Sequence, residues 1–449
     1  MRRIVPLVCL AAVLCGGRLS SQAGAPPTIF DNPRLIIGDG TVIEHGAMIV
    51  QDGRISAVGP AGAINAPRDA ARVDLTGKTV VPGMINTHVH IGYEGYTSWG
   101  ADHYTPKNVL DHLQREAFYG VVATQSVGSS PTDQSIQFQR DQNGGTFPVA
   151  SRFLFMPGMA PPNGGPDAIL LKGTSALHAV SEVSTAAEAR AAVQAMAAKK
   201  LRSVKIWVDD RRGTYPKMPP EVYNAIIAEA HQHQMKVNAH ATTLADQKAV
   251  LRAGVDVLVH TVQSERVDDE LLQIIGETRP YWTTVIGLGD RSEVCNDDLF
   301  VTDTYPPAVV ASIRASSCGE PPPSAAARDA ILTNNVQKMV AAGARLVLGT
   351  DAGITPRYAF GWADHHEMAR WVQFGLSPSQ AIVAATRTPA ELLGLRDLGL
   401  LAAGKSADFI VLNANPLENI RNTREIASVY MRGKAVDRRA LAAKFKGER

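Results

Sequence analysis

The segment INTHVH at residues 85–90 is the first of eight short apolar runs with the character of β-strands. The runs are apolar on both faces, as a sheet covered inside and outside requires. Between them lie Ala-rich stretches with Gly or Pro at their ends, which predict helices, most plainly at 185–200, 221–234 and 324–343. Strand and helix alternating eight times are typical of a TIM-type (β/α)8 barrel, an α/β fold. The other runs are GVVATQSVG (120–128), SRFLFMPG (151–158), SVKIWV (203–208), KVNAHA (236–241), DVLVHT (256–261), YWTTVIG (281–287) and RLVLGTDA (345–352).

Both flanks of this barrel region have a different, hairpin-rich texture. Strand-like runs alternate with turn signals such as Asp39-Gly40 and Asp52-Gly53 in the first flank, and a similar texture returns at 405–416 and 426–437. Neither flank is large enough to fold alone. We therefore predict a barrel over 82–398, one small β-sandwich domain built from 24–81 and 399–436, and a solvated basic tail at 437–449.

The charge balance bears on the class of partner. Lys and Arg number 45 against 43 Asp and Glu, and 45% of the residues are hydrophobic. This composition belongs to globular proteins, and no basic run interleaved with aromatic residues occurs in the body of the chain. Nucleic acid is therefore not the expected partner. A small-molecule substrate is expected, and a homo-oligomer remains open.

The N-terminal residues have the layout of a secretory signal peptide. Arg2 and Arg3 precede the apolar run IVPLVCLAAVLC, and small residues follow at 21–25. We expect cleavage after Ala23 and an exported protein, either periplasmic or secreted. The apolar run is shorter than the ~20 residues that span a bilayer, so no integral membrane segment is expected after processing.

Cysteine usage limits the possible metal ligands. Only Cys295 and Cys318 would remain after processing, and an oxidising compartment would favour a disulfide between them, although a free pair stays open. Metal sites built from several cysteine thiolates are therefore excluded. His, carboxylate or Lys side chains remain as possible metal ligands. The long connection at about 290–323, which contains both cysteines, is predicted to form a lid over the barrel mouth.

Polar side chains collect where the predicted strands end. In a barrel the active site lies at the carboxyl ends of the strands, and residues two apart in a strand share a face. His and carboxylate donors together favour a borderline divalent cation such as Zn²⁺. The residues at these ends are His88, His90, His240, His260 and Asp351, with Lys205 inside the fourth run.

Lys205 needs a separate explanation, because a charged ammonium inside a packed strand is costly unless it is paired or neutralised. Two interpretations stay open at this point. The lysine could pair with Asp209 or Asp210. It could instead react with CO₂ to give a carbamate anion, which would bridge two metal ions.

The ordered motifs resemble those of the metal-dependent amidohydrolase superfamily, and within it the imidazolonepropionase-like and prolidase-like branch that carries a strand-four lysine. The resemblance spans about residues 30–436. The motifs that carry it are VVPGMINTHVH (80–90), VKIW (204–207), NAHA (238–241), LVHT (258–261), GTDAG (349–353) and GKSADFIVLNANPLENIRN (404–422).

The resemblance implies a binuclear site that hydrolyses an amide, peptide-like, lactone or ester bond through a metal-bridging hydroxide. It implies that one metal is held by His88, His90 and Asp351 and the second by His240 and His260, with a carboxylated Lys205 as the bridge. Asp351 is then suited to accept the proton of the hydroxide and to pass it to the leaving nitrogen.

Two segments depart from the pattern of the family near its substrate pocket. Relatives usually show an Arg-Asp pair near ATQSVGSS (123–130), and prolidase-like members tend to carry a His where Pro166 stands. Recognition of a dipeptide carboxylate is therefore not inferred. Residues that could line a pocket for an apolar or aromatic group, or that could equally serve ordinary packing, are Tyr93, Trp99, His103 and Trp207, with His365 in a supporting or substrate role.

Alternatives come from other classes of function. A mononuclear deaminase or cyclic-amide hydrolase of the same superfamily would share the histidines and Asp351 but lack the lysine, so Lys205 argues against it. A non-catalytic binding barrel would be expected to lack a ligand, and the predicted set is complete.

Overall fold

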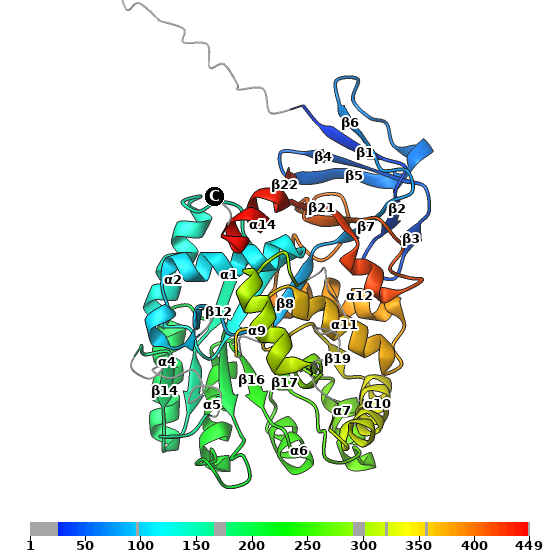
Figure 1. The fold of residues 1–449 in the computed structure, drawn as a ribbon. Coiled ribbons are helices and arrows are strands. Elements are labelled where there is room, and N and C mark those ends of the chain that lie inside the picture. The colour runs from blue at the N-terminus through cyan, green and yellow to red at the C-terminus, as the bar shows by residue number, and fades with distance from the viewer. Residues whose placement is uncertain are drawn as a thin grey trace, which may run out of the picture.

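The computed structural model describes residues 26–95, 98–165, 177–290, 301–318, 322–354 and 358–447. It consists of a barrel surrounded by helices and a smaller β domain that lies above it (Figure 1). All eight predicted strands of the barrel are present. They are β8 (Met84–Val89), β11 (Val121–Val127), β12 (Arg152–Met156), β15 (Ser203–Trp207), β16 (Lys236–His240), β17 (Val257–Val259), β18 (Tyr281–Thr283) and β19 (Arg345–Leu346).

Backbone hydrogen bonds close these parallel strands into a ring. The order β12-β11-β8 forms one ladder, and β14-β13-β15-β16-β17-β18-β19 forms the other, in which β14 (Val180–Glu182) pairs with β13. Pro157 joins the two ladders, because β12 runs through it into β13 (Gly158–Ala160) and its carbonyl accepts from Lys205 N at 2.9 Å. At the opposite seam, Thr87 N donates to Leu348 O and His90 N donates to Ala352 O, both at 2.8 Å. The predicted barrel is confirmed.

The last three strands are shorter than the runs in the sequence. The chain leaves the sheet in left-handed conformations at His260 (φ 76°), Val285 (φ 52°) and Asp351 (φ 60°). Such values are uncommon outside glycine, most of all for a β-branched residue, and they concentrate at functional sites. The backbone turns at these three positions, and at His260 and Asp351 the turn carries a polar side chain.

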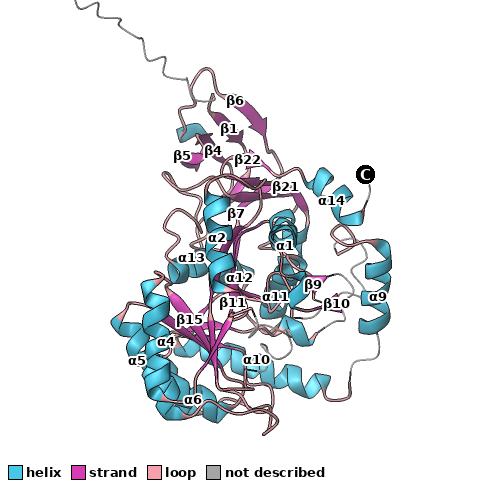
Figure 2. Ribbon diagram, turned by 90° about the vertical axis from the view of Figure 1, so that its left-hand side faces the viewer, coloured by secondary structure: helices cyan, strands magenta, loops and turns pink. Residues whose placement is uncertain are grey.

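Helices cover the outside of the barrel, and the three predicted most plainly are confirmed as α4 (Ala186–Ala198), α5 (Pro220–Gln232) and α10 (Ala325–Ala342). Thr185 and Glu188 form a capping box at the start of α4, and Gly343 ends α10 in the left-handed region. Figure 2 shows the strands enclosed by these helices. The remaining helices are α1 (Pro106–Phe118), α2 (Thr132–Asn143), α6 (Leu244–Arg252), α7 (Asp269–Thr278), α9 (Pro307–Ser317), α11 (Trp362–Gln373), α12 (Pro378–Ala385), α13 (Arg387–Leu393) and α14 (Arg438–Lys446). Within the described residues, no helix combines the length and the apolarity needed to cross a bilayer.

The small domain is a sandwich of two sheets that draws strands from both ends of the chain. Its sheets have the orders β5-β4-β1-β6 and β22-β21-β20-β7-β2-β3, and the two ends of the chain meet where β20 pairs with β7. Phe30 and Met48 of one sheet pack with Val80 and Phe409 of the other. The strands are β1 (Thr28–Asp31), β2 (Arg34–Ile36), β3 (Val42–Ile43), β4 (Gly46–Gln51), β5 (Arg54–Pro60), β6 (Ala71–Asp74), β7 (Thr79–Pro82), β20 (Phe409–Leu412), β21 (Ile426–Met431) and β22 (Lys434–Ala435).

The basic C-terminal segment forms a helix, α14, which is largely exposed but packs one side on the barrel helix α1. Phe445 is only 1% exposed, and the guanidinium of Arg115 lies 5.0 Å from the centre of its ring. Arg438 donates to Phe118 O at 2.9 Å and lies over the Phe118 ring. The many basic residues of this segment indicate solvent exposure, but its single phenylalanine, Phe445, makes a buried apolar contact.

A buried ion pair ties the β domain to the barrel, and removing one partner should destabilise the fold. Arg152 of β12 donates to both carboxylate oxygens of Asp408, at 2.8 and 2.9 Å, and the Asp408 side chain is 1% exposed. Arg152→Met leaves that carboxylate buried without its cation, so we expect the free energy of unfolding to fall by roughly 3 kcal/mol. Denaturant unfolding of the wild type and the variant measures this change in the free energy of unfolding. The control is Arg72→Met, which breaks the exposed pair with Asp31 and should cost less than about 1 kcal/mol. Equal effects of the two variants would contradict the prediction.

Candidate metal centre

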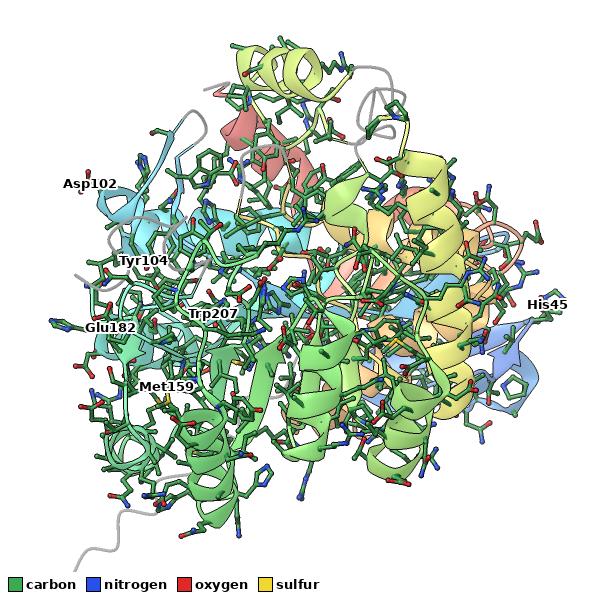
Figure 3. The ribbon with its side chains drawn as sticks, turned by 90° about the horizontal axis from the view of Figure 1, so that it is seen from below. His45, Asp102, Tyr104, Met159, Glu182 and Trp207 are labelled. Carbon is green, nitrogen blue, oxygen red and sulfur yellow. The ribbon has the colours of Figure 1, made fainter. Side chains whose placement is uncertain are left out.

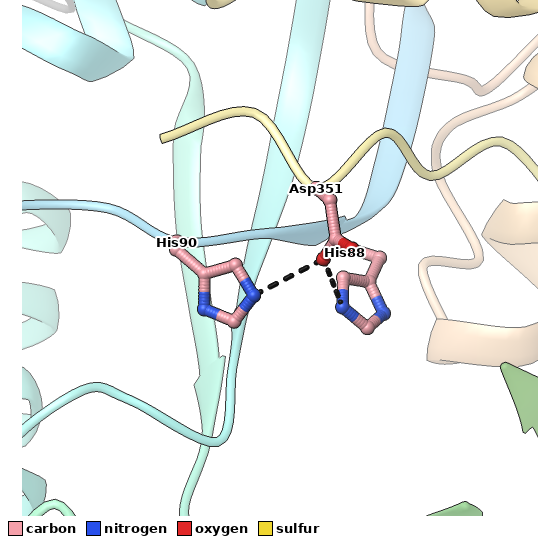
Figure 4. Close-up of side chains that lie close together, drawn as sticks. All are labelled: His88, His90 and Asp351. Atoms are coloured by element: carbon pink, nitrogen blue, oxygen red, sulfur yellow. Dashed lines mark hydrogen bonds and ion pairs between the residues drawn. The ribbon is translucent and has the colours of Figure 1, made fainter. Parts of the chain in front are cut away.

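Three of the predicted ligands form a tight cluster at the carboxyl ends of β8 and β19. Asp351 Oδ1 lies 2.8 Å from His88 Nε2 and 3.1 Å from His90 Nε2 (Figure 4). One ligand atom from each residue lies within 4.8 Å of the others, and all three residues are buried. Two imidazole nitrogens and a carboxylate oxygen converging in this way suit a divalent cation such as zinc.

The backbone explains why these side chains meet. His88 and His90 lie two residues apart at the end of β8 and so share a face. The His88 carbonyl accepts from the amides of Thr350 and Asp351, each at 2.9 Å. Together with the left-handed conformation of Asp351, this contact turns its carboxylate towards the two imidazoles. The cluster therefore lies on the seam that closes the barrel.

The electrostatics of the cluster give the protonation states that a metal requires. Burial, followed by the nearby charge of Lys205, lowers the pKa of His88 to about 4, so its imidazole is neutral. Burial alone would raise the pKa of Asp351, but His88 and His90 hold this pKa well below its ordinary value. Metal ions bind histidine through a neutral imidazole and aspartate through an ionised carboxylate. The residues present thus fit a divalent ion.

His240 and His260 lie together beside this cluster. Their ring centres are 4.2 Å apart, and the His260 ring centre lies 6.0 Å from that of His88. His240 ends β16, while His260 follows β17 in a turn fixed by its own amide, which donates to Thr283 O at 2.8 Å, and by the indole of Trp282, which donates to the His260 carbonyl at 2.9 Å. The structure thus brings the five predicted His and Asp ligands to one end of the barrel.

Lys205 is fully buried within the same region. It pairs in register with Asn238 of β16, two residues before His240. A Cβ at Gly128, where φ is 73°, would come within 2.9 Å of Lys205 Cγ and 2.6 Å of the Trp207 ring, so only glycine fits there. Gly128 lets β11 approach the lysine closely.

Asp209 makes a contact that sequence reasoning missed. Its Oδ2 lies 2.8 Å from His240 Nε2, and its other oxygen accepts from the amide of Arg211 at 2.8 Å. Burial opposes ionisation, but these contacts leave the pKa of Asp209 below its ordinary value. The sequence offers Asp209 as a partner of Lys205. Its position two residues beyond the end of β15 is the signal that points to a role beside His240.

A cavity of about 670 Å³ opens over the site. His240, His260 and Asp351 lie in its wall, which places the candidate ligands where a small molecule can reach them. Leu288 and Ile354 form an apolar part of the wall, and Arg211 and Arg212 form a cationic part. The two arginines lie in the loop after β15, and the sequence analysis does not assign them a role.

Two of the predicted pocket residues lie beside the apolar wall. Tyr93 and Ile354 form one buried cluster, against which Trp99 and Leu288 pack. The hydroxyl of Tyr93 donates to the Ser129 carbonyl. Tyr93 and Trp99 therefore support the cavity from behind Ile354 and Leu288.

The other predicted pocket residues have structural contacts. His103 Nε2 contacts Ser98 Oγ at 2.8 Å in the short hairpin of β9 (Glu94–Gly95) and β10 (Ser98–Trp99). Trp207 is buried and packs on Ala160 and Val180, near the middle of the molecule, whereas Asp102 and Glu182 lie at its edge (Figure 3). His365 contacts the Tyr119 carbonyl and Thr423 Oγ1, both at 2.9 Å, and so ties α11 to the short 3-10 helix at Ile420–Arg424.

The predicted lid and disulfide are only partly described. Val301, Tyr305 and Ile313 pack in the same cluster as Leu113 of α1 and Phe445 of α14. Cys318 is disulfide-bonded. Cys295 lies outside the described residues, so its pairing with Cys318 stays a prediction.

Comparison with known proteins bears on the family and the fold of the chain. The family model of the amidohydrolase family matches residues 79–436. The chain is 23% identical to the ochratoxinase of Aspergillus niger over 92% of this chain and 86% of that protein. It is 30% identical to the enamidase of Eubacterium barkeri, over 21% of this chain and only 24% of that protein. The structure of a Xaa-Pro dipeptidase with bound methionine has a TM-score of 0.70 at 22% identity, covering 91% of this chain and 99% of that chain, which supports the fold.

Members of this family are hydrolases that act on amide-type bonds of small molecules, with divalent metals in general use, and this chain contains a His-His-Asp cluster. The expected family, fold and enzyme class are confirmed. The chain belongs to the amidohydrolase family.

Proposed function

We propose that the protein is an exported, binuclear metal-dependent amidohydrolase that cleaves the C–N bond of a small amide or peptide-like substrate, or the C–O bond of the corresponding lactone or ester. One observation carries this proposal. The cluster of His88, His90 and Asp351 and the pair His240–His260 lie at the same end of the barrel, and Asp351 shares one cavity with the pair.

The donor set suggests how two ions would be held. His88, His90 and Asp351 would bind the first ion, and His240 and His260 the second. The neutral amine of Lys205, buried on the strand next to that of His240, would add CO₂ with loss of one proton to give a carbamate anion that both ions would share. An ammonium at this place would repel both cations, whereas the carbamate anion attracts them. Nitrogen-rich donors favour Zn²⁺.

Asp351 and the barrel wall would have separate roles in the reaction. Divalent ions held by these residues would supply Lewis acidity and a water that ionises near neutral pH. Asp351, ionised before the reaction starts, accepts the proton released during attack and delivers it to the departing nitrogen. The barrel wall around Lys205 and His88 keeps the donors out of bulk water.

The cavity indicates the class of substrate. About 670 Å³ is the size of a small-molecule site. The apolar wall of Leu288 and Ile354, supported by Tyr93 and Trp99, suits an apolar or aromatic group next to the scissile bond.

Elemental analysis of the purified protein, followed by a screen of N-acyl amino acids, dipeptides and lactones, tests the proposal. We expect about two metal equivalents per chain and hydrolysis of at least one substrate class. One equivalent together with ammonia release from an amino-substituted ring would instead identify a mononuclear deaminase. A protein that binds two equivalents and cleaves nothing in the screen would count against the catalytic assignment.

Export is part of the same proposal and rests on the N-terminal pattern of Arg2, Arg3 and the apolar run that follows. We expect the mature chain to begin at Gly24. Intact-mass measurement of protein from the extracytoplasmic fraction checks this, and a full-length mass from the cytoplasm would contradict it.

A further inference from the structure

Asp209 is placed to control the orientation of His240. Asp209 follows the end of β15, and His240 ends the neighbouring strand β16. Asp209 Oδ2 lies 2.8 Å from His240 Nε2, and the two side chains are 5% and 1% exposed. A contact this short between buried groups on adjacent strands has little freedom to rearrange.

The carboxylate of Asp209 is itself held in place. Its Oδ1 accepts from the Arg211 amide at 2.8 Å, and its Oδ2 accepts from Thr242 Oγ1 at 3.3 Å. The guanidinium of Arg211 adds an ion pair, with Nε 3.3 Å from Oδ2. Contacts from both sides therefore fix the acceptor that faces His240.

An ionised carboxylate can only accept hydrogen bonds, so the nitrogen that faces it must carry the hydrogen. A neutral imidazole has one protonated nitrogen and one with a lone pair, and a partner on the first determines which nitrogen is left for a metal. We propose that Asp209 is a positioning residue that holds His240 with its hydrogen on Nε2, so that Nδ1 is the atom that binds the second metal ion. The inference rests on the proposed binuclear function.

This arrangement differs from that of the first cluster. There the carboxylate of Asp351 contacts the Nε2 atoms of both His88 and His90 and is proposed as a ligand itself. Asp209 contacts one histidine only among the pairs described, and its remaining acceptor capacity is taken by Arg211 and Thr242. Asp209 would therefore orient a metal ligand and not bind the metal itself. Metal-binding histidines commonly donate their other ring N–H to such a carboxylate.

Asp210 provides a matched control. It is the next residue in the chain, carries the same charge and lines the same cavity, while its carbonyl accepts from Tyr215 N at 2.9 Å. Asp209→Ala and Asp210→Ala therefore remove the same charge from the same loop, but only the first removes the contact with His240.

Titration of the metal-free full chain with Zn²⁺ tests the affinity of each site. Wild type should bind two equivalents. In Asp209→Ala the first ion should bind as in wild type and the second about 10–100-fold more weakly. Asp210→Ala should behave as wild type, and Asp209→Asn, whose amide oxygen can accept the same hydrogen bond, should recover part of the lost affinity. Unchanged second-site affinity in Asp209→Ala, or equal losses in the two alanine variants, would overturn the proposal.

The tautomer can be read without any metal. Long-range ¹H–¹⁵N spectra of the metal-free protein, with the His240 signals assigned by their loss in His240→Gln, should show hydrogen on Nε2 in wild type and a mixture of tautomers in Asp209→Ala. Hydrogen on Nδ1 in wild type would refute the inference even if two metals bind. A wild type that binds one equivalent but shows the Nε2 tautomer would refute the binuclear function and leave the orientation by Asp209 standing.

Discussion

Asp351→Asn is expected to lower kcat by about 10³-fold, within the range that a lost general base produces, while the fold survives. Asparagine has the shape of aspartate but cannot take up the proton released during attack. The backbone at residue 351 has a φ of 60°, a left-handed value that asparagine tolerates as well as aspartate does. The loss should therefore arise from chemistry and not from strain.

Steady-state kinetics, circular dichroism and metal content measured on the same preparation check this prediction. Asp133→Asn is the control, because that carboxylate lies on α2 with its side chain 82% exposed and pairs with Lys199. The control should keep the wild-type kcat. An Asp351→Asn protein with full metal content and wild-type kcat would remove Asp351 from the proposed role.

Lys205→Ala is expected to reduce bound metal from about two equivalents to about one and to lower kcat by two or more orders of magnitude, roughly the share that a second ion contributes to activating water. Lys205 is fully buried on the strand next to that of His240, so the truncation leaves a space next to the ligands. Added acetate or propionate can enter that space and supply the missing carboxylate. Partial recovery of activity with these acids is therefore expected.

Lys205→Met is the matched control for the recovery. Methionine nearly fills the volume of lysine, so it lacks the carbamate and also blocks the added acid. Activity should fall in both variants and return with acetate in Lys205→Ala alone. A ¹³C signal from labelled bicarbonate on wild type, absent from both variants, would identify the carbamate directly. Full metal content and wild-type kcat in Lys205→Ala would contradict the bridge.

Much of the fold and of the ligand set could be predicted from the sequence because both depend on local pattern. Each barrel strand is a short apolar run, and His88, His90, His240 and His260 stand at or next to the ends of such runs. A closed barrel brings those ends together whatever the intervening loops do. The positions of these ligands thus followed from the architecture.

The remaining features depend on contacts between residues distant in the sequence, or on backbone turns that hydrophobicity does not report. The contact of Asp209 with His240 needs two adjacent strands in register. The packing of Phe445 on α1 needs the two ends of the chain to meet. The left-handed residues His260 and Val285, just beyond β17 and β18, are backbone turns that composition alone does not indicate.

The pairing of β7 with β20 has a consequence for biosynthesis. Lys78 beside β7 donates to Asn413 beside β20, 335 positions later. A ribosome must therefore release nearly the whole polypeptide before this sheet can form, and nascent chains carry β7 with an unsatisfied edge until then. A premature stop codon ahead of residue 409 would leave that edge exposed permanently, so truncated products should aggregate or be degraded rather than accumulate as free barrels.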